Sequence, residues 1–552
     1  MELKSKIPNL KSKMLSLDAR VNECGPPCPP WCDSSVGCST TDKPGLGQGV
    51  LQMRKIGMST PKNLILSFLL FLLSGCALPF SSQSSLFTER PQDCQEFLDA
   101  LDKEVDDAGV RDASSCLIDD FPYLRTNRFL SALNKNLKDE KTREQWVRLL
   151  QQLDLRAREK EIQNLPEQSV ISLIPEEGAN RKWLYNRVES CSNKLLGHDT
   201  THPEFYENLS PLATFPDEYS FARRTFGLYP VFSIPVALVT AQSRKSSRSR
   251  FNSDLDAIPL KGELRHVVPR EKVVLKEEMI QEIIEESRAN PLQVPLLDDV
   301  NAKKLVVAFA PIIIQDVAAH YDRLGKVLWE KGRLAIDPTH PTVYYYTSHA
   351  FFKGEPILQI NYVIWYSKTA GQETPWIERG YLDGLTTRIS LDTQGKPFMI
   401  DVMKNCGCYQ LFAPQKERFQ GTVSRRFKPD LLVAQWMPTV PSGKRLGVRV
   451  SSGWHQVERL LATEIPPDPI HYQLLPYDVL EILPYGGGET KSMFNSKGIV
   501  EDSKRGKEEV LLFSMGIPSI GSMRQRGRHP SELIGRIHCD DPELFDRYFI
   551  SR

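Results

Sequence analysis

Hydrophobic and polar residues follow different patterns in the two halves of this 552-residue chain. In the first half, apolar residues recur every three or four positions over 92–106, 142–162 and 179–196, as along one face of an α-helix. From about residue 260 the pattern becomes alternation or short apolar runs rich in Val, Ile and Tyr, which favour strands. We therefore predict an α+β fold, with a helical N-terminal region followed by a β-rich, largely antiparallel C-terminal region.

The C-terminal region is expected to contain several short strands and one helix, at 276–287. Lys353-Gly354-Glu355 separates two apolar runs and predicts a hairpin turn between them. The predicted strands are 304–314, 326–334, 342–352, 356–366, 386–391, 397–402, 431–436, 446–451 and 510–513.

The segment between these regions is ambiguous. Residues 216–240 are rich in aromatic and aliphatic side chains, and a basic run follows at 244–250. Pro230 and Pro235 argue against one continuous helix. A buried core segment followed by a solvated loop is the favoured interpretation, and an element at a membrane surface is the alternative. We predict a mainly helical region (91–240), a polar linker (241–258) and a β-rich α+β domain (259–552).

A short apolar run lies near the start of the chain, at 64–73. Arg54, Lys55 and Lys62 precede it, and the sequence Leu73-Ser74-Gly75-Cys76 ends it. A basic start, a short apolar centre and small residues at the end are typical of a secretory signal, and the run is too short to span a bilayer.

Residues 53–76 resemble the lipobox signal of bacterial lipoproteins. The resemblance implies that Cys76 is the lipid-carrying first residue of the mature protein. It also implies localisation in the cell envelope. The residue after Cys76 is Ala77 rather than Asp, which fits sorting to the outer membrane, facing the periplasm. Residues 91–552 show no resemblance to a characterised family.

The signal also predicts how the N-terminal part is divided. Export signals lie at the N-terminus, so Met53 or Met58 is the expected start, and residues 1–52 are an upstream extension of the gene. Residues 53–75 are then the signal peptide, and 76–90 a Ser-rich tether between lipid and body.

The charge balance limits the expected partners. Lys and Arg total 70 against 69 for Asp and Glu, so nucleic acid is not expected as a partner. The expected partners are the membrane, through the lipid anchor, and an envelope component or another protein. No cofactor is predicted.

Six cysteines follow Cys76, and an oxidising envelope compartment favours disulfides among them. Cys94 with Cys116 is the preferred pair. A weaker alternative is soft-metal ligation. Its candidate ligands are Cys406, Cys408, His538 and Cys539.

The C-terminal stretch concentrates positive charge. Two interpretations stay open: an anion site built from guanidinium forks and glycine-rich backbone, or a structural element whose arginines pair with local carboxylates. The arginines are Arg524, Arg526, Arg528 and Arg536, and the carboxylates are Asp540, Asp541, Glu543 and Asp546.

Residues suited to acid–base chemistry are present, but they form no recognised catalytic motif. The main hypothesis is a lipid-anchored envelope protein that binds an envelope component or a protein partner. The alternative is an envelope hydrolase or metal-dependent enzyme that uses the C-terminal Arg/His-rich element. It requires the candidate residues to converge on one pocket. The candidates are His349, Asp383, Asp401, His455, His529 and His538.

Overall fold

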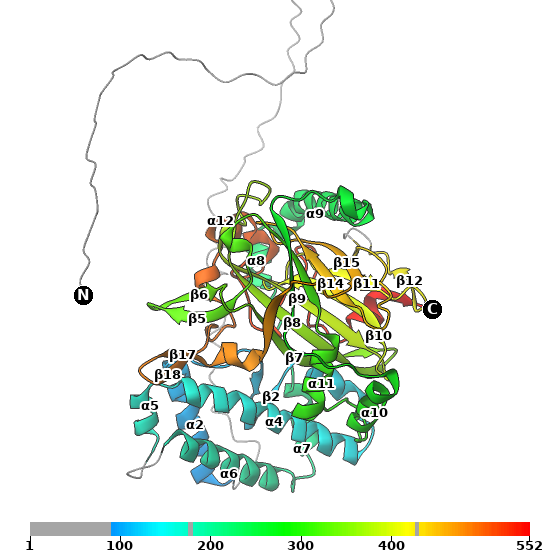
Figure 1. Cartoon of the computed structure of the whole chain (residues 1–552). Coiled ribbons are helices and arrows are strands. Elements are labelled where there is room, and N and C mark those ends of the chain that lie inside the picture. Colours follow the sequence, from blue (N-terminus) through cyan, green and yellow to red (C-terminus); the bar gives the residue numbers. More distant parts are fainter. Residues whose placement is uncertain (1–89, 175–179, 426–429) are drawn as a thin grey trace, which may run out of the picture. The chain divides into compact units, whose positions relative to one another are not determined.

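The computed structural model describes residues 90–174, 180–425 and 430–552, all within one compact unit, Gln83–Arg552. The predicted upstream extension, signal peptide, Cys76 and nearly all of the tether lie outside the described residues. The α+β prediction is confirmed: helices gather in the N-terminal half, and a large, mostly antiparallel sheet forms in the C-terminal half (Figure 1).

The N-terminal helices pack around a small hairpin that the sequence did not predict. The apolar side chains of α2, such as Leu98 and Leu101, are buried together with Trp146 of α4. Local capping sets the helix starts: Asp139 and Thr142 form a capping box on α4, and Asn180 caps α6. The elements are α2 (Gln92–Asp107), β1 (Cys116–Ile118), β2 (Phe121–Thr126), α3 (Arg128–Leu133), α4 (Glu140–Asn164), α5 (Glu167–Ser172), α6 (Arg181–Asp199) and α7 (Phe205–Leu212).

A disulfide joins the two helices that flank this core. Cys94 of α2 bonds to Cys191 of α6, so the predicted Cys94–Cys116 pair was wrong. The helical packing places both bonded cysteines in the core. Cys116 lies on β1 instead, where its Sγ accepts a hydrogen bond from Arg528.

Eleven strands form the main sheet, in the order β13-β11-β10-β9-β8-β7-β16-β3-β4-β14-β15. The β7–β8–β9–β10–β11 run is antiparallel, whereas β16 pairs in parallel with both β3 and β7. The strands are β3 (Glu263–Pro269), β4 (Ile312–Val317), β7 (Thr342–Phe352), β8 (Glu355–Thr369), β9 (Gly380–Leu391), β10 (Pro397–Lys404), β11 (Leu411–Pro414), β13 (Leu432–Val433), β14 (Arg445–Val450), β15 (Val457–Thr463) and β16 (Ile470–Pro476).

Smaller elements complete the C-terminal half. Helices α10 (Glu277–Ser287) and α11 (Asp299–Phe309) contribute apolar side chains to the core of the sheet. The others are β5 (Lys326–Glu330), β6 (Arg333–Asp337), β12 (Phe419–Thr422), β17 (Leu483–Gly486), β18 (Glu489–Lys491), α12 (Gly506–Leu511), α13 (Leu544–Tyr548) and β19 (Phe549–Ser551).

Two predicted strands were wrong. Most of 304–314 is α11, because Asp298 caps a helix start and the following apolar run forms its buried face. Residues 510–513 include the end of α12 and the start of a 3-10 helix, η6 (Phe513–Met515). A third prediction, 326–334, is interrupted by a turn at Lys331-Gly332, which separates β5 from β6.

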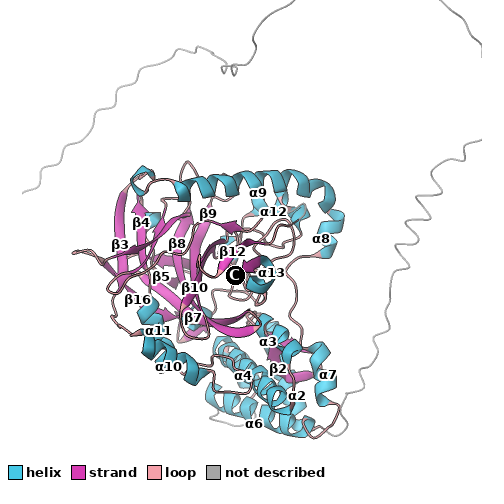
Figure 2. Ribbon diagram, turned by 90° about the vertical axis from the view of Figure 1, so that its right-hand side faces the viewer, coloured by secondary structure: helices cyan, strands magenta, loops and turns pink. Residues whose placement is uncertain are grey.

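The predicted linker at 241–258 is also wrong, because its first part is helical. Helix α8 (Phe221–Phe226) is followed by α9 (Tyr229–Asn252), which runs along the top of the unit in Figure 2. Pro230 is tolerated in the first turn of α9, where a missing N–H removes no helical hydrogen bond. Pro235 lies inside the same helix.

Candidate functional site

Asp383 and His455, two of the predicted catalytic residues, lie together in a buried chain of charged groups. His455 Nδ1 is 2.9 Å from Asp383 Oδ2, and its Nε2 is 3.2 Å from Asp322 Oδ1. Lys404 Nζ donates to Asp383 at 3.0 Å. The chain therefore runs Asp322–His455–Asp383–Lys404, and we call these four residues the His455 network.

The sheet register brings these groups together. Lys404 of β10 stands opposite Leu385 of β9, so Lys404 and Asp383 project from the same face. Asp322 ends a 3-10 helix, η3 (His320–Asp322), and His455 lies between β14 and β15. The network thus connects η3 and the β14–β15 loop to the adjacent strands β9 and β10.

Each carboxylate of the network has several donors. Asp322 accepts hydrogen bonds from the N–H groups of Ala318, Ala319 and Gly453 and from the Ser452 hydroxyl. Burial alone would raise the pKa of Asp383, but the Lys404 charge and the His455 hydrogen bond hold it well below its ordinary value. Asp383 therefore stays ionised within the core.

Strained backbone surrounds the network. Leu382, Tyr409 and His455 have φ values of 56°, 55° and 50°, a region that non-glycine residues seldom occupy. The His455 ring stacks on Tyr366 with centroids 3.9 Å apart, and the Tyr366 hydroxyl donates to Gln315. These contacts hold the imidazole in place despite its unusual backbone.

The network is closed to solvent. Asp322, Asp383 and His455 have no exposed surface. A cavity of about 250 Å³ has Asp322 in its wall, together with Gln315, Arg265 and Arg323. The ionic groups face one another, so the contacts support a structural role.

An acidic pair lies beside the network, and the sequence did not predict it. Glu378 accepts hydrogen bonds from the Tyr409 hydroxyl at 2.5 Å and from the Trp454 indole at 2.8 Å. Burial, together with the Glu378 charge, raises the pKa of Glu508 to about 7. Glu508 comes from α12, near the surface described below.

The other acid–base candidates are scattered. Asp401 pairs with Arg388 at 2.9 Å, and His529 lies 3.0 Å from Asp540. His349 contacts the Pro295 carbonyl, and His538 lies 2.7 Å from Glu218. The convergence that the hydrolase alternative requires is limited to Asp383 and His455.

Three of the predicted metal ligands, Cys406, Cys408 and Cys539, lie close together, but among the described residues they form no group whose ligand atoms could hold one ion. Cys408 donates its N–H to Cys406 Sγ, and the Cys539 thiol points to the Gly407 carbonyl. His538 instead approaches Asp217 and Glu218. Since Arg128 and Arg528 both pair with Glu218, and Arg536 with Asp217, positive charge opposes a cation there.

The four C-terminal arginines do not share an anion site. Arg526 pairs with Asp478 and Glu481, and Arg528 with Glu218. Arg524 donates to the carbonyl of Pro518, and Arg536 lies 3.5 Å from Asp217. The structural interpretation therefore fits the contacts, but the carboxylates come from other parts of the chain than predicted.

A different feature lies on the surface, in α8 and α9. The side of α9 that packs toward β13, β15 and η6 carries mainly small residues before Phe251, whereas the outer side of its first half carries large apolar ones. Half-buried residues recur at helical spacing on the inner side: Ser233, Ala237, Thr240, Ser243 and Ser247.

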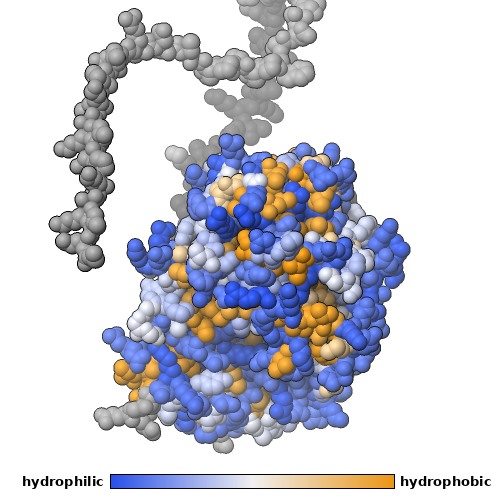
Figure 3. Space-filling model, viewed as in Figure 1, coloured by the Kyte–Doolittle hydropathy of each residue, from blue (hydrophilic) through white to orange (hydrophobic). Residues whose placement is uncertain are grey.

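We define the α8–α9 apolar surface by its most exposed large side chains. They are between 51% and 83% exposed, and Figure 3 shows apolar surface where α9 lies in Figure 1. The residues are Phe221, Phe226, Leu228, Val231, Phe232, Ile234, Leu238 and Val239. Exposed Val510, Leu511 and Phe513 belong to α12 and η6, which pack beside α8.

Comparison with known proteins identified no matching family model, no similar curated protein and no similar solved structure. Within the part of the chain that the structure describes, no helix has both the length and the apolar character to cross a membrane.

Proposed function

We propose that this protein is a lipid-anchored protein of the cell envelope, facing the periplasm, that binds an envelope component through the α8–α9 apolar surface. The observation that carries the proposal is the orientation of α9, which turns its apolar side chains toward water. Contiguous exposed apolar patches of this kind typically mark interaction sites. The lipobox resemblance of residues 53–76 indicates the expected localisation in the cell envelope.

A binding role fits the contacts better than a hydrolase does. The charged groups of the His455 network are occupied by one another, and the C-terminal arginines are occupied by carboxylates and carbonyls. The α8–α9 apolar surface, by contrast, leaves large side chains without burial. A surface of this type is stabilised when a partner removes it from water.

Fractionation of cells that express three forms of the chain tests this function. The unchanged chain should incorporate labelled palmitate and sediment with membranes. Cys76→Ala should lose the label and be only partly released, because the α8–α9 apolar surface still binds. Adding Phe232→Ser, Leu238→Ser and Val239→Ser to Cys76→Ala should release the protein fully.

Three results would overturn the proposal. Complete release of Cys76→Ala would show that the surface binds nothing in the envelope. Retention of the serine variant at the level of Cys76→Ala would show that another part of the chain holds it there. Palmitate labelling that persists in Cys76→Ala would reject the anchor.

A further inference from the structure

We propose that the bound component is an anionic lipid bilayer, and that α9 lies parallel to its surface with its apolar side chains among the headgroups and upper acyl chains. The inference rests on the proposed function and names the component that the surface binds. Three features of the described residues carry it: the shape of the surface, its charge and the way the body holds α9.

The apolar side chains protrude from a single helix. Val231, Leu238 and Val239 are between 61% and 71% exposed. The cavity of about 250 Å³ lies elsewhere, between β3, β4, η3 and β16. Protruding aliphatic and aromatic side chains suit a fluid interior that closes around them, and surface-lying helices bury their apolar face in this way.

The charge is one-sided. Residues 221–253 contain six basic residues and no acidic one. Arg223 and Arg244 pair with Glu509 and Glu532 of other elements. Lys245 and Arg248 are exposed on the second half of α9, next to the apolar first half, and Arg248 also donates to the Leu431 carbonyl. Basic residues that flank an apolar stretch are attracted to anionic headgroups, each raising affinity roughly five-fold.

The body holds α9 as a formed helix. Arg244 donates to the Asp430 carbonyl, and Arg459 donates to the Ser253 carbonyl just beyond the helix end. Small inner residues such as Ala237 and Ser243 let the helix approach the unit closely. Because the helix is already ordered, binding requires no coil-to-helix transition and no loss of its apolar presentation.

The experiment uses the full chain with Cys76→Ala, so that no attached lipid contributes to binding, and every variant keeps the same apolar run at 64–73. Co-sedimentation is measured with vesicles of phosphatidylethanolamine and phosphatidylglycerol, and with vesicles of phosphatidylcholine alone. We expect at least ten-fold tighter binding to the anionic vesicles, and a decrease as salt is raised.

Two further variants, each in the Cys76→Ala chain, separate the apolar and the basic contributions. Phe232→Ser, Leu238→Ser and Val239→Ser together should weaken binding to anionic vesicles at least ten-fold. Lys245→Ala with Arg248→Ala should weaken it by about twenty-five-fold, as expected for two basic residues, and should leave phosphatidylcholine binding unchanged. Both sets are exposed, so thermal unfolding should match that of the parent chain.

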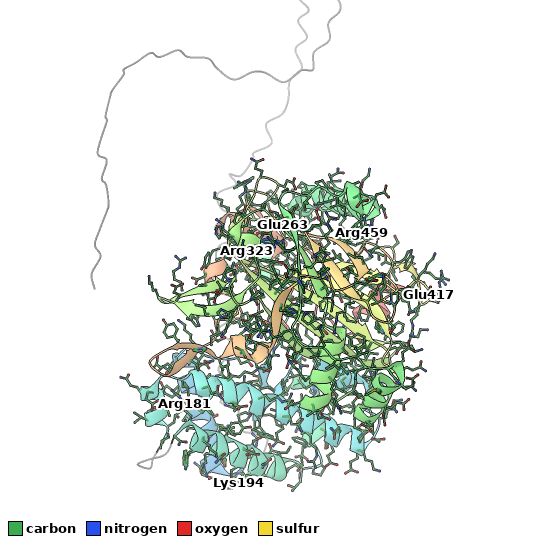
Figure 4. All side chains as sticks on the ribbon, viewed as in Figure 1. Arg181, Lys194, Glu263, Arg323, Glu417 and Arg459 are labelled. Carbon is green, nitrogen blue, oxygen red and sulfur yellow. A yellow bond between two sulfur atoms is a disulfide. The ribbon has the colours of Figure 1, made fainter. Side chains whose placement is uncertain are left out.

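Matched controls change the same residue types elsewhere on the unit. Ile171→Ser, Val274→Ser and Val300→Ser remove equally exposed apolar side chains that are isolated from α9. Lys182→Ala with Lys194→Ala removes two exposed charges on α6, which lies at the other end of the unit from α9 (Figures 1 and 4). Neither control should alter vesicle binding.

The outcomes distinguish this inference from the function it rests on. If Cys76→Ala stays with the envelope but binds neither vesicle type, the bound component is a protein. The proposed function then stands and the lipid inference fails. A dimer that the serine variant abolishes would also overturn the lipid inference. Equal binding of anionic vesicles by the serine variant and the parent would overturn it as well. If Cys76→Ala binds neither envelope nor vesicles, both proposals fail.

Discussion

The His455 network keeps charged side chains away from water, whereas α9 keeps apolar side chains in it. In the network, every charge meets an opposite charge or a hydrogen-bond donor from another element of the same chain. On α9, Leu238 and Val239 lack an equivalent partner within the described chain. Both regions depart from the usual pattern of apolar residues inside and charged residues outside. Only the His455 network has contacts within the chain that offset this departure.

Whether a residue has partners within the chain distinguishes structural from functional residues in this protein. Asp383 and His455 carry groups typical of catalysis, yet their contacts satisfy one another inside the core. Valines and leucines are typical of cores, yet those of α9 face outward. The α8–α9 apolar surface is therefore the better guide to function. Changes in the His455 network should lower stability, whereas changes on α9 should lower binding.

The largest effect on stability is expected for Lys404→Met. This change leaves the Asp383 carboxylate buried with only His455 as a partner, because Lys404 supplies two of its hydrogen bonds. Removing one member of a buried ion pair typically costs about 3–5 kcal/mol of unfolding free energy. Urea denaturation, followed by tryptophan fluorescence, measures the loss.

Lys396→Met is the matched control, because Lys396 is exposed before the start of β10. Its effect should stay within about 0.5 kcal/mol. Lys404→Met with Asp383→Asn should recover part of the loss, since no buried charge is then left unpaired. Equal stability of Lys404→Met and the parent would contradict the structural role assigned to the network.

The sequence predicted only half of this network. Asp383 and His455 were candidates because of their residue types, but Asp322 and Lys404 were not. Their proximity depends on the register of β9 with β10 and on the position of η3 beside the β14–β15 loop. Contacts between residues some 70 to 130 positions apart in the sequence follow from tertiary packing, which local patterns do not encode.

A smaller, pH-dependent effect is expected for Glu508→Gln. The pKa of Glu508 is raised from 4.5 to about 7, so the folded state binds its proton more tightly than the unfolded state does. Its contribution to stability is complete below pH 4.5 and is lost as the pH rises to about 7. Glutamine should therefore stabilise the protein at pH 8, by up to about 3 kcal/mol, and change little at pH 4.5.

Melting temperatures of the two forms between pH 4.5 and 8 test this expectation. Glu489→Gln, an exposed position on β18, serves as the control and should follow the parent at every pH. A melting difference for Glu508→Gln that stays constant across the range would contradict a buried, protonated carboxyl. Loss of stability at pH 8 would reverse the sign and reject it.

Local patterns predicted elements well where one face is strongly apolar. The helices at 92–106 and 142–162 and the strand at 342–352 agree closely with α2, α4 and β7. The apolar run at 304–314 was wrongly predicted to be a strand, because a short buried run fits a helix or a strand equally well. In α9, Val231, Ile234 and Leu238 recur at helical spacing, but spacing alone does not distinguish an inward face from an outward one.

The smallest effect on stability is expected on α9, where the apolar side chains are already in contact with water. Leu238→Ser with Val239→Ser removes two large side chains that are 69% and 71% exposed. Because folding buries little of their surface, their removal should cost little stability. The free energy of unfolding should therefore change by no more than about 0.5 kcal/mol, measured in urea as for Lys404→Met. The equivalent change at two buried sites of the paired strands β14 and β15, Val448→Ser with Leu460→Ser, should cost several kcal/mol, because both side chains belong to the core of the sheet. A large loss for the α9 pair would show that these residues pack within the chain and would remove the basis for a binding surface. An unchanged stability combined with lost envelope binding would instead place their whole contribution in the interaction.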